Sequence, residues 1–174
     1  IVSAQTNISG VINDYAAVSS IDECTNSMSV DVTTGFSIGD SILIVQMKGA
    51  TMDLTNTVNY GDLVSLNNAG LYEYNTINSI VGNVITFDNV FQNNYQVTGF
   101  VQIVSFPNYT GNVTVNGVLT ASAWNGLKGG ILTFKVGGVL TLNENIDVSS
   151  LGFRGGVNIP LPAASYNCNF FTTA

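Results

Sequence analysis

The strongest constraint on the fold is a ten-residue stretch that occurs twice at a fixed spacing. Residues 113–122 (VTVNGVLTAS) superpose on residues 140–149 (LTLNENIDVS) when the sequence is shifted by 27 positions. In both copies, apolar residues recur at every second position on either side of an asparagine. A single strand–corner–strand unit cannot bury its apolar face alone, so such units become stable by stacking. The repeat therefore predicts stacked coils, with a structural turn at Asn116 and Gly117.

The sequence before the repeat is typical of strands. Residues 41–47 (SILIVQM) are apolar at nearly every position, which predicts a central strand buried on both faces. Gly82 and Asn83 separate two β-like runs and predict a two-residue hairpin turn. Residues 48–66 have little pattern, and we expect a long loop or two short edge strands there. Residues 14–22 carry the one hint of helical spacing, which predicts a short helix or a turn.

These patterns predict an all-β chain with two parts. The 174 residues suffice for one domain, or for a small domain and the beginning of a second. We expect a small β-barrel or sandwich domain over residues 5–107. The start of a β-solenoid, resembling a β-helix and truncated, should follow over residues 108–174. Residues 1–4 (IVSA) resemble the tail of a secretory signal peptide, which predicts cleavage before Gln5, and an ordered leading strand is the alternative.

The charge content argues against several classes of partner. The chain has 11 acidic and 4 basic side chains, a net charge of −7, and only 9% charged against 45% hydrophobic residues. With no basic stripe to neutralise phosphates, nucleic-acid binding is not expected. No apolar run approaches the roughly 20 residues that a spanning helix requires, so we expect no direct membrane insertion. A weakly charged, Asn- and Thr-rich β surface is typical of extracellular proteins.

The chain has two cysteines, Cys24 and Cys168. In a secreted chain an even number permits one disulfide, and this pair would close a very long loop. A partner for Cys168 beyond residue 174 is an equal alternative. Because histidine and CxxC spacing are both absent, we expect no zinc or redox site. We expect no cofactor, and calcium stays open without any motif that indicates it.

The residue types also argue against catalysis. Without histidine, the Ser-His-Asp and Cys-His arrangements cannot be built. Paired carboxylates are the remaining acid–base route, but solvated turn residues are the simpler interpretation of these acids. We therefore assign no catalytic residue. Trp124, Tyr72 and Tyr74 are candidates for contact with a glycan, because aromatic faces contribute binding area at low entropic cost. Ordinary packing is the alternative for each of these rings.

Four segments carry a family resemblance: residues 38–49 (IGDSILIVQMKG), 70–74 (GLYEY), 123–126 (AWNG) and 147–156 (DVSSLGFRGG). They are similar to the N-terminal regions of large secreted surface proteins of Bacteroidota. These include giant adhesins exported by the type 9 secretion system, among them gliding-motility adhesins of the SprB type. The resemblance implies a non-catalytic, multi-domain protein with an N-terminal β region, exported through a C-terminal signal and attached to the outer cell surface.

The leading hypothesis is thus a non-enzymatic segment of an extracellular adhesin on a Gram-negative cell surface. Its expected partners are the secretion or outer-membrane surface machinery, further repeats of the same chain, or a surface polysaccharide. Two alternatives stay open. One is a carbohydrate-active β-helix enzyme, a lyase or glycosidase, with catalytic coils beyond residue 174. The other is a structural surface filament subunit that assembles through exposed strand edges.

Overall fold

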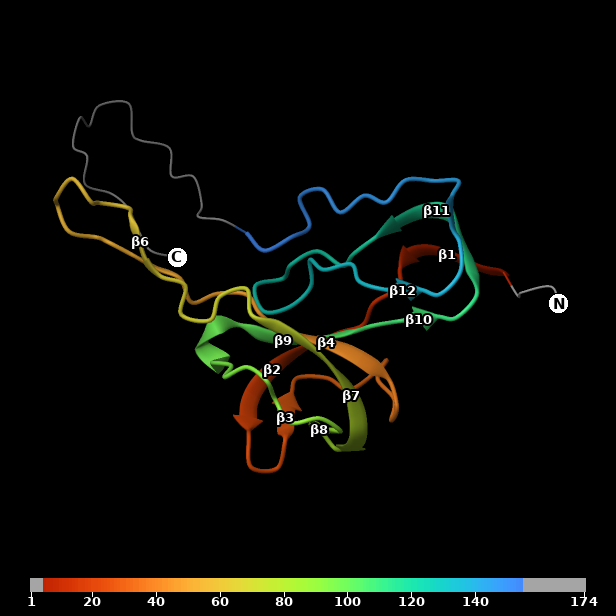
Figure 1. Ribbon diagram of the computed structural model, residues 1–174, viewed down its shortest axis with the longest axis horizontal. Helices are drawn as coiled ribbons and strands as arrows, with labels where there is room; N and C mark the ends of the chain where they lie inside the picture. The colour runs from red at the N-terminus through yellow and green to blue at the C-terminus, as the bar shows by residue number, and fades with distance from the viewer. Residues whose placement is uncertain (1–4, 155–174) are drawn as a thin grey trace.

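A computed structural model describes residues 5–154 of the chain (Figure 1), and the predicted cleavage site at residues 1–4 lies outside this range. The described residues form an all-β fold with one short 3₁₀ turn at Val97–Gly99, which confirms the predicted class. None of these residues belongs to a helix long and apolar enough to cross a bilayer. The strands are β1 (Gln5–Val11), β2 (Tyr15–Asp22), β3 (Ser27–Val30), β4 (Ser41–Gln46), β5 (Thr51–Met52), β6 (Leu63–Ser65), β7 (Tyr72–Val81), β8 (Val84–Phe87), β9 (Val101–Ser105), β10 (Asn108–Tyr109), β11 (Asn112–Thr120), β12 (Lys135–Val136) and β13 (Leu140–Leu142).

Six strands close into a barrel in the order β2-β3-β8-β7-β4-β9. Side chains alternate along each strand, so every second residue fills the interior. On β4, Ile42 and Ile44 are fully buried in this interior, while Leu43 packs against a second cluster on the outer face. The interior also contains Ala16, Val18, Met28, Val30, Phe36, Ile77, Ile85, Phe87, Tyr95, Val101 and Ile103. The predicted barrel is therefore present, and a sandwich is not.

Several local predictions are confirmed. β4 pairs with both β7 and β9 and is buried on both faces, as its continuous apolar run predicted. β7 and β8 pair around Gly82 and Asn83, and Gly82 has the positive φ of 58° that such a turn requires. Residues 48–66 contain the short antiparallel pair β5–β6, which projects from the barrel as an arm (Figure 1).

The expected helix or turn at residues 14–22 is wrong, because this segment forms β2. β2 pairs with both β3 and β9, and its Ala16 and Val18 enter the barrel core. Val18 and Ile21 are β-branched and fit a pleated surface better than a helix. The few helically spaced residues were thus outweighed by pairing with distant strands.

The repeated stretches lie on neighbouring parallel strands, in the predicted register. Val113 pairs with Leu140 and Val115 with Leu142, and an isolated bridge joins Leu119 to Ile146. Each pair keeps the 27-residue offset. The same offset relates β10 to β12, which form a second parallel sheet. Residues 108–124 are therefore stacked on residues 135–151 as two successive coils.

A third strand joins this stack from the beginning of the chain. The sheet order is β1-β11-β13, and β1 runs parallel to β11 with Gln5 opposite Asn112 and Ile8 opposite Val115. The sequence patterns group residues 5–11 with the barrel, and the structure corrects this expectation by placing β1 in the sheet of the coils. Ile8 packs with apolar residues of the coils, whereas the barrel closes without β1. The stacked unit is defined here as β1 together with residues 108–154.

Asn116 and Gly117 do not form a chain-reversing turn, because both lie inside β11. The ladder between β1 and β11 is irregular at this point, since the register shifts between Ile8 and Gly10. Gly117 faces Ser9, and a Cβ at Gly117 would lie 3.1 Å from the Ser9 Cβ. The lack of a side chain at Gly117 thus makes room for a bulge in the sheet, and a glycine inside a strand often marks such a bulge.

Residues 129–133 join the stacked unit to the outer face of the barrel through alternate residues. The Gln102 amide donates to the Gly129 carbonyl (3.2 Å) and accepts from the Gly129 N–H (2.8 Å). The Tyr15 hydroxyl donates to the Ile131 carbonyl, and Asn13 forms two hydrogen bonds with the backbone of Thr133. This segment therefore lies along the barrel much like an extra strand, although its bonds are to side chains.

Candidate binding surface

The outer face of the barrel carries two rows of side chains that each end on an exposed tyrosine. In the first row the strand register aligns Tyr15, Val104, Leu43 and Tyr74 across β2, β9, β4 and β7. The first three are buried and pack with Ile131 of the stacked unit, whereas Tyr74 is 54% exposed. The covering segment thus leaves the side chain on β7 open to solvent.

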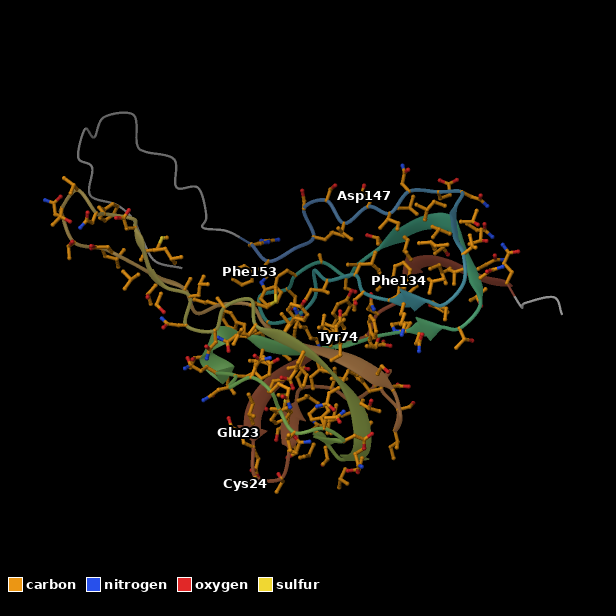
Figure 2. The ribbon with its side chains drawn as sticks, viewed as in Figure 1. Glu23, Cys24, Tyr74, Phe134, Asp147 and Phe153 are labelled. Atoms are coloured by element: carbon orange, nitrogen blue, oxygen red, sulfur yellow. The ribbon has the colours of Figure 1, made fainter. Side chains whose placement is uncertain are left out.

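The second row has the same arrangement. Ala17, Gln102 and Val45 are aligned on β2, β9 and β4, and Tyr72 follows on β7. Gln102 is fully buried beneath Gly129, and Tyr72 is 60% exposed. Tyr72 and Tyr74 are therefore neighbours on one face of β7. Figure 2 shows Tyr74 at the border between the barrel and the stacked unit.

The aromatic surface continues from β7 to the end of β9. The rings of Tyr72 and Tyr74 lie 6.1 Å apart between centroids and are nearly perpendicular, at 79°. Tyr74 in turn contacts Phe106, with centroids 4.7 Å apart and an angle of 41°. These three residues are called the aromatic strip below. Tyr72 and Tyr74 were predicted contact residues, and Phe106 was missed because it lies 32 positions away in the sequence.

A buried carboxylate holds β7 in place beneath the strip. Glu73 lies between the two tyrosines and points to the other face of the strand. Its carboxylate accepts hydrogen bonds from the backbone N–H groups of Gln92 and Asn93, at 2.9 and 3.0 Å, and from the Asn93 side chain. Glu73 therefore ties loop residues 92–93 to the strand, and the sequence contained no local signal for this contact.

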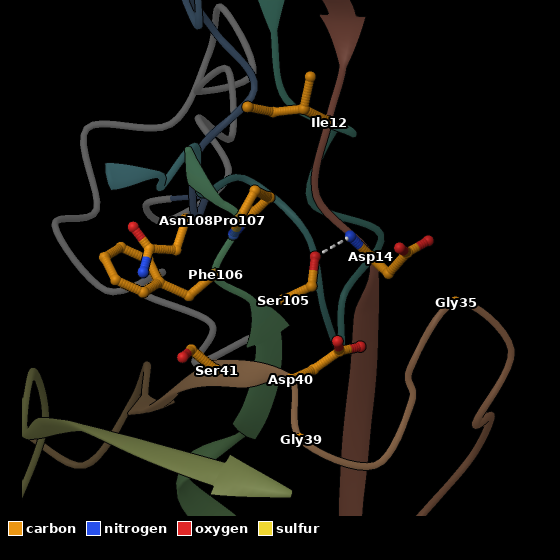
Figure 3. Close-up of a pocket in the computed structure, with 10 residues that line it drawn as sticks. All are labelled: Ile12, Asp14, Gly35, Gly39, Asp40, Ser41, Ser105, Phe106, Pro107 and Asn108. Atoms are coloured by element: carbon orange, nitrogen blue, oxygen red, sulfur yellow. Dashed lines mark hydrogen bonds between the residues drawn. The ribbon is translucent and has the colours of Figure 1, made fainter. Parts of the chain in front are cut away.

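A pocket of about 430 Å³ opens at Phe106 (Figure 3). It lies where the chain enters the barrel before β2 and leaves it after β9, because its lining includes Ile12, Asp14, Ser105, Pro107 and Asn108. The loop before β4 closes the other side and brings Asp40 and Ser41 to the pocket. The linkers before β2 and after β9, together with the loop before β4, thus form its walls.

Two carboxylates dominate the polar lining of the pocket. Asp40 accepts a hydrogen bond from the Ser37 N–H at 2.8 Å, whereas the Asp14 carboxylate accepts none from any residue in the described range 5–154. Partial burial, followed by repulsion from Asp40, raises the pKa of Asp14 above its usual value. Gly35 packs against the Asp14 carboxylate, at a positive φ of 90°. Asp14 therefore retains free acceptor capacity on the side of the pocket that Gly35 lines, whereas Phe106 and Asn108 lie on the opposite side (Figure 3).

The third predicted aromatic contact residue is buried. Trp124 is 7% exposed and packs between Phe100 and Phe153, with centroid distances of 6.2 and 5.1 Å. Its ring is therefore a packing element of the stacked unit and has no free face for a sugar. This corrects the prediction that Trp124 contacts a glycan: its ring packs in the interior, as the alternative interpretation held.

The remaining site predictions concern cysteine and metal chemistry. Cys24 is exposed and unbonded within residues 5–154, at the barrel end remote from the stacked unit (Figure 2). Cys168 lies outside the described residues, so its pairing with Cys24 stays a prediction. Among the described residues, no three His, Cys, Asp or Glu side chains gather as a metal ion would need.

Comparison with known proteins gives structural neighbours and no family. No protein-family model matches the sequence, and neither does any curated protein. The Gp54 tailspike of Acinetobacter baumannii bacteriophage AP22, solved in complex with A. baumannii capsular saccharide, matches 67% of this chain at 13% identity and a TM-score of 0.37. The tailspike gp49 of Pseudomonas phage LKA1 matches 80% of it at 13% identity and a TM-score of 0.35. The chain spans about a quarter of each tailspike, 23%. At these TM-scores, the likeness carries no argument about function.

Proposed function

We propose that this chain is the N-terminal, non-enzymatic region of a large extracellular surface adhesin, in which β1 and residues 108–154 form the first coils of a β-solenoid. The observation that carries the proposal is a difference between the two ends of the stacked unit. Ile8 on the first coil is 7% exposed and Val115 on the second is fully buried, but Leu142 on the third is 56% exposed. At this position the first coil buries its apolar side chain, whereas the third coil presents its own at an exposed edge.

The exposed edge of the third coil carries the apolar side chains and the asparagine that pair with the coil below it. Ile146 stacks on the buried Leu119 yet is itself 41% exposed, so the apolar column continues to the edge. The Asn143 amide donates to the Asn116 oxygen of the coil below at 3.0 Å, and such asparagine ladders extend from coil to coil. In repeat proteins each unit is stabilised mainly by its neighbours, and uncovered terminal units need a cap. A further coil of the same protein would bury this edge.

The non-enzymatic part of the proposal rests on the composition. The 174 residues contain no histidine and only four basic side chains, which leaves few groups for acid–base chemistry. A carbohydrate-active enzyme with catalytic coils beyond residue 174 is the alternative. Release of reducing ends from pectin or glucan by a longer protein that includes those further coils would favour that alternative over an adhesin.

The coil proposal is tested by one substitution in two contexts. Leu142→Ser in the 174-residue chain should lower the free energy of unfolding by less than about 1 kcal/mol, because the side chain is largely in water. In a longer protein with the following coil, the same change should cost about 2–4 kcal/mol, because it removes a buried leucine. Val118→Ser is the control, since Val118 is exposed on the middle coil and should respond equally in both contexts. An equally small loss for Leu142→Ser in both proteins would contradict the proposal.

Surface location is tested on intact cells of the source organism. An antibody against the β5–β6 arm should label unpermeabilised cells, and added protease should remove the label, because an adhesin segment lies outside the outer membrane. Labelling that requires permeabilisation would contradict the extracellular assignment.

A further inference from the structure

We propose that the aromatic strip and the adjoining pocket form a binding site for a neutral oligosaccharide. This inference deepens the proposed adhesin function by naming a ligand class, and rests on it for its biological meaning. Its physical basis is the joining of three exposed or half-buried rings, a pocket and two carboxylates at one place on the surface.

The tyrosines provide accessible aromatic faces. Tyr72 and Tyr74 are each more than half exposed, although their neighbours on β4, Val45 and Leu43, are buried. An aromatic ring binds the C–H face of a sugar through its apolar body, and a tyrosine hydroxyl can bond to a sugar hydroxyl at the same time. Packing against Phe106 and the backbone bonds of Glu73 hold the strip rigid, so little entropy is lost when a ligand binds.

The ring arrangement selects the shape of the ligand. Successive centroids lie 6.1 and 4.7 Å apart, comparable with the length of one pyranose unit, so neighbouring rings can contact neighbouring sugars. Since the two tyrosine rings are nearly perpendicular, a flat ribbon cannot stack on both of them. The strip therefore suits a chain with a helical twist, such as an α-1,4- or β-1,3-glucan.

The pocket supplies the polar half of the recognition. Sugar hydroxyls donate hydrogen bonds, and the Asp14 carboxylate has acceptor capacity that no described residue uses. Hydrogen bonds to a charged acceptor are stronger than those between neutral groups. Ser41 and Asn108 line the same pocket and add side chains that both donate and accept. A sugar that leaves the strip at Phe106 thus meets groups matched to its hydroxyls.

Charge determines which sugars are accepted. Asp14 and Asp40 lie together in the pocket, no Lys or Arg among residues 5–154 lines it, and the whole chain carries a net charge of −7. Uronic acids and sulfated sugars would place a negative charge beside these carboxylates, which repels them. The site is therefore specific for neutral sugars.

The test is calorimetric titration of the 174-residue chain with maltohexaose, laminarihexaose and hexagalacturonate. We expect binding of at least one neutral glucan and at least tenfold weaker binding of hexagalacturonate. Tyr74→Ala should weaken glucan binding by about tenfold, which is about 1.4 kcal/mol, because it removes an aromatic face from the contact. Tyr74→Phe keeps the ring and should retain most of the affinity, which separates a contact from a folding defect. Tyr60→Ala, on the β5–β6 arm, is the control and should bind as the unmodified chain does.

Three results would overturn the site: no binding of either glucan at millimolar concentration, unchanged binding by both Tyr72→Ala and Tyr74→Ala, or equal affinity for hexagalacturonate. Any of these leaves the proposed solenoid standing if Leu142→Ser behaves as expected, and leaves the surface location standing if the antibody labels intact cells, because neither measurement depends on the strip or the pocket. Conversely, if glucan binds but Leu142→Ser costs the same small amount in the 174-residue chain and in the longer protein, the binding site is kept and the solenoid is rejected.

Discussion

Replacing Gln102 with methionine should weaken the contact between the stacked unit and the barrel and lower the free energy of unfolding. Gln102 is fully buried, and its side-chain amide forms two hydrogen bonds with the backbone of Gly129. Methionine has a similar volume and length, so it can fill the space without a cavity. The change therefore removes both hydrogen bonds and leaves the Gly129 N–H and C=O without partners in a buried position.

The expected cost follows from those two orphaned groups. Leaving one buried donor or acceptor unsatisfied costs about 1–3 kcal/mol, so two cost about 2–5 kcal/mol if relaxation is partial. Gly129 cannot easily move to find new partners, because a positive φ of 104° and the close Ala123 carbonyl fix its position. For a chain of this size the loss corresponds to a melting temperature about 5–15 °C lower.

Urea denaturation followed by circular dichroism and by the fluorescence of Trp124 measures this loss. Trp124 is the single tryptophan and lies in the stacked unit, so its emission reports on the part that Gln102 anchors. Gln92→Met is the matched control. The Gln92 side chain is exposed and, among the residues that the structure describes, bonds only to the nearby Val90 carbonyl, so its loss should stay within about 0.5 kcal/mol. A loss below 0.5 kcal/mol for Gln102→Met as well would refute the reasoning.

Gln102→Glu gives the same prediction a pH signature. A protonated carboxyl group reproduces the amide, because its O–H donates to the Gly129 carbonyl and its C=O accepts from the Gly129 N–H. Burial and the facing carbonyl raise the pKa of this glutamate in the folded state above its unfolded value of about 4.3. The variant should therefore match the unmodified chain below pH 4 and lose stability relative to it as the pH rises through the raised pKa. A difference that does not change with pH would contradict this account.

Three further predictions concern single residues. Gly99→Ala should destabilise the fold by about 1–3 kcal/mol in urea denaturation, because a Cβ there would collide with the buried Gln46 side chain, whereas Gly152→Ala, with open space around it, should be neutral. Burial raises the pKa of Tyr95, so folding stability should fall as the pH rises above about 10, where the unfolded chain ionises, and Tyr95→Phe should flatten this fall in melting temperature. Asp14→Asn should raise the melting temperature at pH 7 and lose this advantage below about pH 4, because the raised pKa of Asp14 marks a carboxylate whose charged form is disfavoured in the fold.

Those parts of the fold that depend on local or periodic signals could be predicted from the sequence. Parallel stacking in register places apolar residues on apolar residues. The pairing of Val115 with Leu142 could therefore be predicted from the 27-residue repeat. The hairpin at Gly82 and the buried strand β4 depend on a few consecutive residues. Each of these signals lies within a short stretch of sequence.

The position of β1 could not be found in this way. Its register with β11 is offset by 107 positions, as in the pair Thr6 and Val113, and a shift between Ile8 and Gly10 removes any constant spacing. The candidate site was only half visible for a similar reason. Tyr72 and Tyr74 could be named as candidate contact residues, but only the folded barrel brings Phe106 against Tyr74 and gathers Asp14 and Asp40 in the pocket that Phe106 lines. Trp124 shows the reverse error, since nothing local marks it as buried by Phe100 and Phe153.

The 107-residue offset also explains why the candidate site lies where it does. Between β1 and β11 the chain passes through the whole barrel, whereas the next pair of coils is separated by only 27 residues. The barrel is thus inserted into the connection between two coils. Its first and last strands, β2 and β9, are neighbours, and Asp14 and Ser105 close the insertion with a backbone bond of 2.9 Å and a side-chain bond of 2.8 Å.

An insertion that opens and closes at one point leaves two linkers side by side, and these linkers line the pocket. Binding sites form preferentially at such junctions, because neither part alone provides a concave surface. The buried rows under residues 129–133 fix the angle between the parts, and the same rows end on Tyr72 and Tyr74. The contacts that hold the barrel against the coils therefore also place the aromatic strip beside the pocket. A substitution that loosens this boundary, such as Gln102→Met, should accordingly weaken glucan binding without touching any residue that contacts the sugar.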